Sequence, residues 1–309
     1  MKVVPEVLNR HTIADKAFLA TSRLRLGEAF SEGAVSPSFH EHLQELKFEM
    51  PPLSDGGSHT FAIESAAGPM EALYDVLLWA DPRAPTVVWL HKGGEVPFDR
   101  TARAVFLTER PIEANVVTVR MPFHKSRKEF RSGLAYLSRF IAMMAAGVEI
   151  TERLVTSPGL SQSSRVLVAG YSLGGFVANR HHLHTNSAGA YVPLMAGTAQ
   201  GEPWLSTLPV AAIARQRPDA LRQSLNFQNE WAAASPHDNV FPVLGKHDQV
   251  CRWDVQRPSY GDRKVAAWDI GHVTGWRAHP RIRQKVLRHL FEGLEEPEWA
   301  GERANSAKG

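Results

Sequence analysis

Short apolar runs alternate along the chain with segments in which apolar residues recur every three or four positions. The runs have the length of buried strands, and the other segments have the spacing of amphipathic helices. Parallel strands need crossover connections, so the alternation predicts an α/β fold with a mostly parallel central sheet of about eight helix-flanked strands. The expected strands span residues 59–65, 72–80, 86–90, 115–121, 166–169, 189–196, 239–244 and 264–270.

Helices are expected on both sides of these strands. Before the first strand, the sequence favours one helix over residues 6–30 and another over 37–47, with Ser36 as N-cap and proline at the first helical position. The apolar positions of the first helix are Leu8, Ile13, Ala17, Leu24 and Ala29. Later helices are expected where apolar residues recur between 134 and 155, and over 280–291.

A breaker cluster at residues 51–57 separates the first two helices from the sheet. We therefore divide the chain into a helical extension (1–58), a main domain (59–291) and an acidic, polar tail (292–309) that we expect to be flexible. The extension could cover the mouth of an active site or pack against the outside of the sheet, and its sequence pattern is compatible with both.

Composition narrows the class of protein. The chain has 309 residues, 43% of them hydrophobic, and it holds no apolar run of about 18 residues, as a membrane span requires. A single cysteine, Cys251, excludes an internal disulfide framework, and the first residues lack the pattern of a secretory signal. These features favour a cytoplasmic protein with no integral membrane segment.

Charge is unevenly distributed although the net charge is only +3. Residues 1–60 carry a net charge of −2 and residues 292–309 carry −3, which leaves +8 on the rest of the chain. This excess could attract an anionic substrate, or it could belong to a solvated surface of mixed charge. No interleaved basic and aromatic motif indicates binding to nucleic acid, and the sequence does not define an oligomeric state.

The strongest candidate for chemistry is Gly-Tyr-Ser-Leu-Gly at residues 170–174. It follows the apolar run 166–169 and precedes a new apolar pattern, the order expected for a strand, a sharp turn and a helix. A serine on such a turn, here Ser172, has an exposed hydroxyl next to a helix N-terminus that favours negative charge. Gly170 and Gly174 would allow the close approach of strand and helix. A glycine-rich turn without chemistry is the alternative interpretation.

This stretch resembles the nucleophile elbow of the α/β-hydrolase superfamily of serine esterases and lipases. The resemblance covers roughly residues 59–291, and it implies a lid in the irregular segment 197–237, which contains Trp204 and Trp231. It also implies that a catalytic acid and a histidine follow the serine in the chain.

The acid and the base are assigned from their places after the last two strands. Asp248 follows the strand 239–244 and a glycine, as the acid of the family does, and we prefer it to Asp238, Asp254 and Asp269. His272 follows the strand 264–270 and precedes the closing helix, as the base of the family does. His247 is interpreted as a neighbour of the acid.

Two backbone N–H groups are expected to form the oxyanion hole. One belongs to Leu173, directly after the serine. The other is expected in the segment 91–94, His-Lys-Gly-Gly, which resembles the His-Gly-Gly-Gly motif of the family but has Lys92 where a glycine is usual. We assign the second donor to Gly93, with Gly94 as the alternative, and a plain glycine turn also remains open.

Other chemical candidates are weaker. The basic segment 121–128 could line a pocket or bind an anion, but a solvated loop is the simpler interpretation. Cys251 lies near the predicted acid and is interpreted as a packing residue. Residues 181, 182 and 184 are histidines, but no carboxylates or cysteines accompany them at the spacing of metal ligands, so no metal site is predicted there.

Together these residues predict a serine hydrolase that cleaves a carboxylester or a lipid acyl ester of a small molecule, without a cofactor. The two tryptophans of the expected lid favour an apolar acyl group. The same triad would serve a thioesterase or an acyltransferase. A non-catalytic binding protein with this fold is a further alternative, which the unusual Lys92 loop keeps open.

Overall fold

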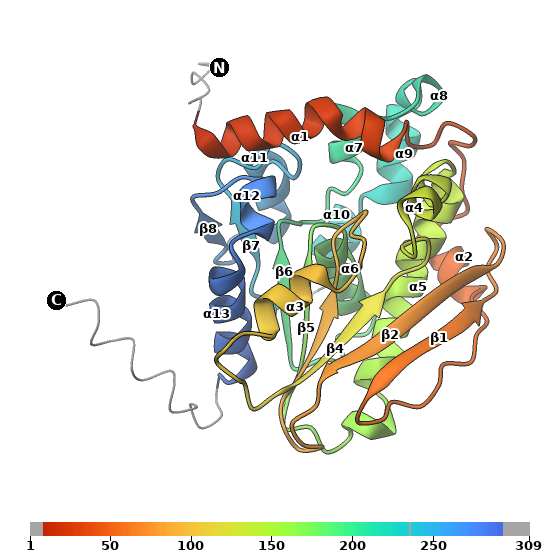
Figure 1. Ribbon diagram of the computed structural model, residues 1–309. Coiled ribbons are helices and arrows are strands. Elements are labelled where there is room, and N and C mark those ends of the chain that lie inside the picture. The colour runs from red at the N-terminus through yellow and green to blue at the C-terminus, as the bar shows by residue number, and fades with distance from the viewer. Residues whose placement is uncertain (1–8, 235, 293–309) are drawn as a thin grey trace.

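An eight-stranded sheet forms the centre of the computed structural model, which describes residues 9–234 and 236–292 (Figure 1). Its order is β1-β2-β4-β3-β5-β6-β7-β8, with β2 antiparallel to β1 and β4 and all other neighbours parallel. This confirms the predicted fold class. The strands are β1 (Gly57–Ile63), β2 (Met70–Leu78), β3 (Thr86–Leu90), β4 (Asn115–Arg120), β5 (Val166–Tyr171), β6 (Ala190–Leu194), β7 (Val243–Gly245) and β8 (Ala266–Trp268).

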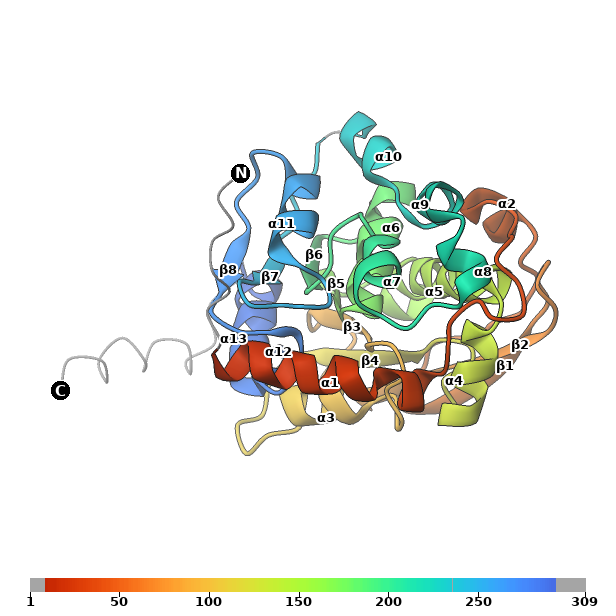
Figure 2. The ribbon, with the colours of Figure 1, turned by 90° about the horizontal axis from the view of Figure 1, so that it is seen from above.

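The helices connect the strands and cover both faces of the sheet (Figure 2). They are α1 (Arg10–Leu26), α2 (Phe39–Gln44), α3 (Arg100–Phe106), α4 (Arg127–Leu134), α5 (Leu137–Val155), α6 (Leu173–His184), α7 (Glu202–Ser206), α8 (Ala212–Arg215), α9 (Pro218–Leu225), α10 (Gln228–Ala233), α11 (Trp253–Gln256), α12 (His272–Trp276) and α13 (His279–Leu290). Helices α7 to α10 lie in the segment 197–237, for which a lid is predicted.

The buried strands separate two apolar cores. All five residues of β3 are buried, and because neighbouring side chains of a strand point to opposite faces, they divide between the cores. Val88 and Leu90 belong to the core that contains α5 and α6, whereas Val87 and Trp89 belong to the core that contains α3 and α13. Continuous apolar runs in this sequence therefore mark strands that are covered on both faces.

Several predicted boundaries differ from the structure. The N-cap of α2 is Ser38, not Ser36, because the Ser38 hydroxyl accepts the N–H of Glu41, whose carboxylate accepts the N–H of Ser38 in return. The helix expected between residues 134 and 155 is α5, which begins at Leu137, whereas Leu134 is the last residue of a separate helix, α4. Helix α3 was not predicted. Of the predicted helix 6–30, residues 10–26 are helical, and residues 6–8 lie outside the described residues. Residues 293–309 of the predicted tail also lie outside them.

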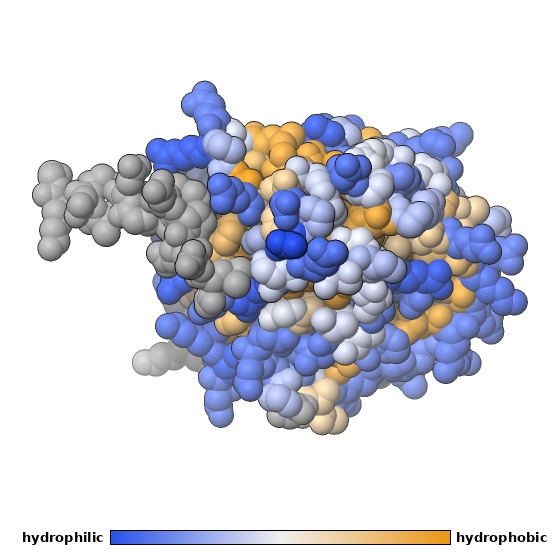
Figure 3. All heavy atoms as spheres, turned by 90° about the horizontal axis from the view of Figure 1, so that it is seen from below, coloured by the Kyte–Doolittle hydropathy of each residue, from blue (hydrophilic) through white to orange (hydrophobic). Residues whose placement is uncertain are grey.

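Helix α1 crosses the top of the molecule in Figure 1, directly above α12. Figure 3 shows the opposite end, where apolar residues lie in separate patches between hydrophilic ones. Within residues 9–234 and 236–292, no helix is both long enough and apolar enough to span a bilayer.

Candidate active site

Ser172 occupies a sharp turn between β5 and α6. Its φ of 52° places it in the left-handed region, and its N–H donates to the carbonyl of Leu194. The turn depends on the absence of two side chains. A Cβ on Gly170 would lie 2.3 Å from the Gly174 oxygen, and one on Gly174 would lie 2.2 Å from the Leu90 oxygen. The turn therefore presents the serine at the end of the sheet and at the N-terminus of α6.

The structure brings Ser172, His272 and Asp248 together in one chain of hydrogen bonds. The His272 Nδ1 lies 2.7 Å from Asp248 Oδ2, and its Nε2 lies 3.1 Å from Ser172 Oγ. A carboxylate only accepts, so Nδ1 carries the ring proton and Nε2 of the neutral ring is free to accept from the serine hydroxyl. This is the tautomer that a general base needs.

The predicted acid is held in place by its own loop after β7. The second oxygen of Asp248, Oδ1, accepts the N–H groups of Val250 at 2.8 Å and Cys251 at 2.7 Å. The Asp248 side chain is completely buried, and His272 is 4% exposed. Both oxygens of the carboxylate are therefore engaged, which fixes the direction in which Asp248 faces the histidine.

The other acidic candidates pair with surface residues instead. They are Asp238, which pairs with Arg263, Asp254, which pairs with Arg252, and Asp269, which pairs with His247. Each of these carboxylates is mostly exposed. His247 is thus occupied by Asp269 and does not contact Ser172.

The residues of the two expected oxyanion donors, Gly93 and Leu173, lie next to each other. A Cβ placed on Gly93 would contact the side chain of Leu173 at 3.7 Å, so the two residues are neighbours. The N–H of Gly94 donates to His124 Nε2 at 3.1 Å. Among the described residues, no acceptor engages the N–H of Gly93. The geometry therefore favours Gly93 over Gly94 as the second donor.

Two buried histidines fix the loop that carries Gly93. His91 Nε2 accepts the N–H of Met121, and its Nδ1 donates to the carbonyl of Lys92. His124 accepts from Gly94 and donates to the carbonyl of Pro122. Burial lowers the pKa of His91 to about 4 and that of His124 well below its usual value, so both rings are neutral acceptors.

The Lys92 side chain has partners of its own, Glu95 and Trp276. Its ammonium lies 3.4 Å from Glu95 Oε2 and 4.6 Å from the centre of the Trp276 ring. Burial lowers the pKa of Lys92, while the charge of Glu95 acts in the opposite direction. Lys92, which replaces a glycine of the family motif, thus packs against Glu95 and Trp276. The loop that carries Lys92 still places Gly93 next to Leu173.

A cavity of about 390 Å³ opens over Ser172 and His272. Its wall combines apolar side chains with cationic side chains at its edge. The apolar group includes Phe18, Leu26, Phe130, Phe140, Leu173, Phe176, Trp204, Leu208 and Trp276, and the cations are Arg25, Lys92, Arg100 and Arg127. Trp231, by contrast, stacks on His237 with ring centres 4.1 Å apart and does not line the cavity.

No protein-family model matches the sequence, and a search of the curated proteins finds no match either. Several solved structures are similar in fold. An acetyl xylan esterase from Thermoanaerobacterium sp. JW/SL YS485 is 12% identical, with a TM-score of 0.51 and coverage of 85% of this chain and 96% of the other. A peroxisomal alpha-beta-hydrolase from Saccharomyces cerevisiae is 13% identical, with a TM-score of 0.50 and coverage of 85% and 94%. The chain has the α/β-hydrolase fold.

On this α/β-hydrolase fold, helix α1 adds a contact that the sequence did not predict. Asp15 is fully buried, and its carboxylate accepts three backbone N–H groups at 2.7 to 3.0 Å, from Gln249, His272 and Val273. His11 on the same helix bonds to the Thr274 hydroxyl at 2.7 Å. One carboxylate of α1 thus ties together the loop of the predicted acid and the loop of the predicted base.

Cys251 is buried, and His181 and His182 are held by hydrogen bonds. Burial raises the pKa of the Cys251 thiol well above its usual value, as the packing interpretation requires. His181 bonds to Glu152 and Tyr191, and His182 bonds to His237. Within residues 9–234 and 236–292, no group of three side chains is arranged to hold a metal ion.

Proposed function

We propose that this protein is a serine hydrolase that cleaves carboxylic esters through an acyl-enzyme. The observation that carries the proposal is the hydrogen-bonded chain Ser172–His272–Asp248, at 3.1 and 2.7 Å, on the wall of an open cavity. The similar acetyl xylan esterase is named for ester cleavage, but at 12% identity it supports only the fold. The assignment of roles therefore depends on the side-chain geometry.

In the proposed reaction, Ser172 Oγ attacks the ester carbonyl while His272 Nε2 takes the hydroxyl proton. Asp248 holds the ring and stabilises its cationic form. The N–H groups of Leu173 and Gly93 stabilise the oxyanion, and a single donor of this kind contributes about 10²–10³ in rate. His272 then returns the proton to the leaving alcohol, and water activated by the same histidine releases the acid.

The cavity suggests which esters fit. Aromatic side chains such as Phe130, Phe176 and Trp204 would pack against an apolar acyl or alcohol group. Arg25 and Arg127 lie at the edge, and neither pairs with a carboxylate in the described part of the chain. We therefore propose an ester with one apolar part and one anionic group.

A fluorophosphonate probe tests the reactive serine directly. We expect covalent labelling of the wild type, none of Ser172→Ala, and at least about a hundredfold slower labelling of His272→Ala, because the serine then lacks its base. Ser206→Ala, which removes an exposed serine on α7, is the matched control and should label like the wild type. Equal labelling of the wild type and Ser172→Ala, or no labelling of the folded wild type, would reject the proposal.

A further inference from the structure

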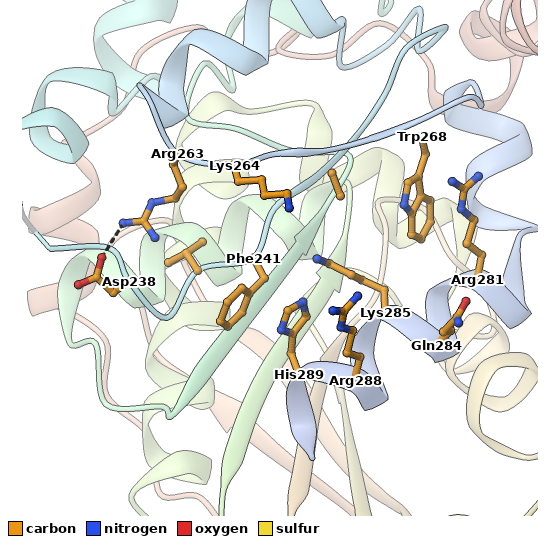
Figure 4. A pocket seen from close by; sticks show the side chains of 12 residues that line it. Asp238, Phe241, Arg263, Lys264, Trp268, Arg281, Gln284, Lys285, Arg288 and His289 are labelled. Carbon is orange, nitrogen blue, oxygen red and sulfur yellow. Dashed lines mark hydrogen bonds and ion pairs between the residues drawn. The ribbon is translucent and has the colours of Figure 1, made fainter. Parts of the chain in front are cut away.

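A second cavity, of about 650 Å³, lies between β8 and α13 and shares no residue with the cavity over Ser172 (Figure 4). Its wall comes from the segment before β7, from β8 and the residues that precede it, and from one face of α13. The lining residues are Asp238, Val240, Phe241, Arg263, Lys264, Ala266, Trp268, Arg281, Gln284, Lys285, Arg288 and His289.

The wall of this cavity is strongly basic. Five lysine and arginine side chains line it, against one carboxylate, Asp238, which pairs with Arg263 at 3.4 Å and is 87% exposed. Lys264 and Lys285 extend from opposite walls toward the same space in Figure 4. In the described part of the chain, no carboxylate lies within ion-pair distance of Lys264, Lys285 or Arg288. Within residues 9–234 and 236–292, most of the cations of the wall therefore have no carboxylate at ion-pair distance.

Burial and crowding of like charges act on Lys285. Burial lowers its pKa to about 8, with a further contribution from Arg288 on the same helix and from Lys264 on the opposite wall. Glu292 acts in the opposite direction. A negative charge in the cavity would reverse this effect, because it favours the protonated amine.

His289 adds an unpaired polar atom to the wall. The residue is 7% exposed, and its ring stacks on that of Phe241 with ring centres 3.8 Å apart. Its Nδ1 lies 2.8 Å from Glu292 Oε2. Its Nε2 is buried and has no partner among the described residues. Burial lowers the pKa of His289, so the ring is neutral, and because Nδ1 donates to Glu292, Nε2 is an acceptor. Buried polar atoms in proteins normally have a hydrogen-bond partner, and this nitrogen would bond to a donor group elsewhere on a ligand, not to a phosphate oxygen.

We propose that this cavity binds a small molecule carrying a diphosphate or triphosphate group, separately from the chemistry at Ser172. Several adjacent phosphate charges match the several unneutralised cations, whereas a single carboxylate would leave most of them unpaired. Lysine supplies point charges and arginine supplies a planar set of donors, and both suit phosphate oxygens. Because the charges face a recess of about 650 Å³, a small ligand fits them better than a nucleic acid or a membrane surface.

Isothermal titration calorimetry of the full-length protein with inorganic triphosphate at low ionic strength tests this site. We expect one binding site per chain, and binding weakened at least about tenfold in the double variant Lys285→Gln/Arg288→Gln, which loses two charge-assisted contacts. The matched control, Lys47→Gln/Arg83→Gln, removes the same charge from two exposed positions elsewhere and should bind like the wild type. Ser172→Ala should also bind like the wild type.

Proton linkage provides a second readout, specific to Lys285. At pH 8 the free amine is about half protonated, and a bound polyanion should complete its protonation, so binding takes up protons from the buffer. Lys285→Arg should keep the affinity and lose the proton uptake, since arginine is always charged. Absence of binding at about 1 mM triphosphate, or an equal loss of affinity in both double variants, would overturn the proposal.

Discussion

His272 is the residue whose ionisation controls the proposed chemistry. Its burial acts to lower its pKa, but the charge and hydrogen bond of Asp248, together with the charge of Asp15, outweigh burial and the net shift is upward from 6.5. Only the neutral ring can accept the proton of Ser172. The environment that stabilises the cationic ring in the reaction thus also reduces the fraction of active enzyme in acid.

This balance predicts the acid limb of the pH profile. The dependence of kcat/KM on pH reports the pKa of the free enzyme, so the activity of the wild type on an uncharged ester should fall through an apparent pKa above 6.5 as the pH decreases. The measurement is the initial rate of hydrolysis of 4-nitrophenyl butyrate between pH 5 and 9. An acid limb centred below 6.5 would contradict the upward shift of the His272 pKa.

At the scale of elements, α1 differs most from an ordinary surface helix. Its buried residues are polar, namely His11, Thr12, Asp15 and Ser22. Ile13 is 52% exposed and Leu24 is 79% exposed. The reason lies in what the helix covers, since loops at the end of the sheet present free backbone N–H groups that need acceptors rather than apolar contacts. The N-terminal helix is therefore attached to the site through a carboxylate.

We predict that Asp15 is a positioning residue for the catalytic loops. Asp15→Asn keeps the size of the side chain, but its NH₂ group would face a backbone N–H that needs an acceptor. The substitution also removes the negative charge that raises the His272 pKa. We expect kcat for a short uncharged ester to fall about tenfold or more with little change in KM, and the acid limb of kcat/KM to move to lower pH.

The matched control for Asp15 is Ile13→Ala, on the exposed side of the same helix, which should leave kcat and the pH profile unchanged. Thermal unfolding separates positioning from stability, because an unpaired buried N–H costs about 1–3 kcal/mol whatever its role. If Asp15→Asn lowers the melting temperature and leaves kcat and the acid limb of the folded enzyme as in the wild type, the residue serves stability alone.

The sequence predicted the sheet and the positions of Ser172, Asp248 and His272 because each of these depends on local order. Each residue follows a strand, and strand ends of one parallel sheet meet at one edge. Asp15 could not be predicted in this way, since its partners lie 234 to 258 positions away and no local pattern marks them. The capping box of α2 has a local signal, because Ser38 and Glu41 have the required spacing, but Ser36 before proline is a competing N-cap signal.

For the whole molecule, the uneven charge has a structural counterpart. Part of the positive excess of the body of the chain lies at two separate places, the edge of the cavity over Ser172 and the cavity beside α13. The negative segments at either end contribute Asp15 to the loops of the proposed acid and base, and Glu292 to His289. Charge near Ser172 is thus available to attract a substrate without involving the second cavity.

We predict that kcat/KM depends on salt for anionic esters and hardly at all for neutral ones. Raising the ionic strength from about 0.01 to 0.15 M shortens the screening length from about 30 to 8 Å. Hydrolysis of the monosuccinate ester of 4-nitrophenol should therefore slow relative to that of 4-nitrophenyl butyrate, by about threefold to tenfold, because Arg25 and Arg127 no longer attract the anion. The double variant Arg25→Gln/Arg127→Gln should lose this salt dependence, and Lys285→Gln/Arg288→Gln should retain it. A ratio of the two rates that is independent of salt in the wild type would show that the cations at the edge do not select the substrate.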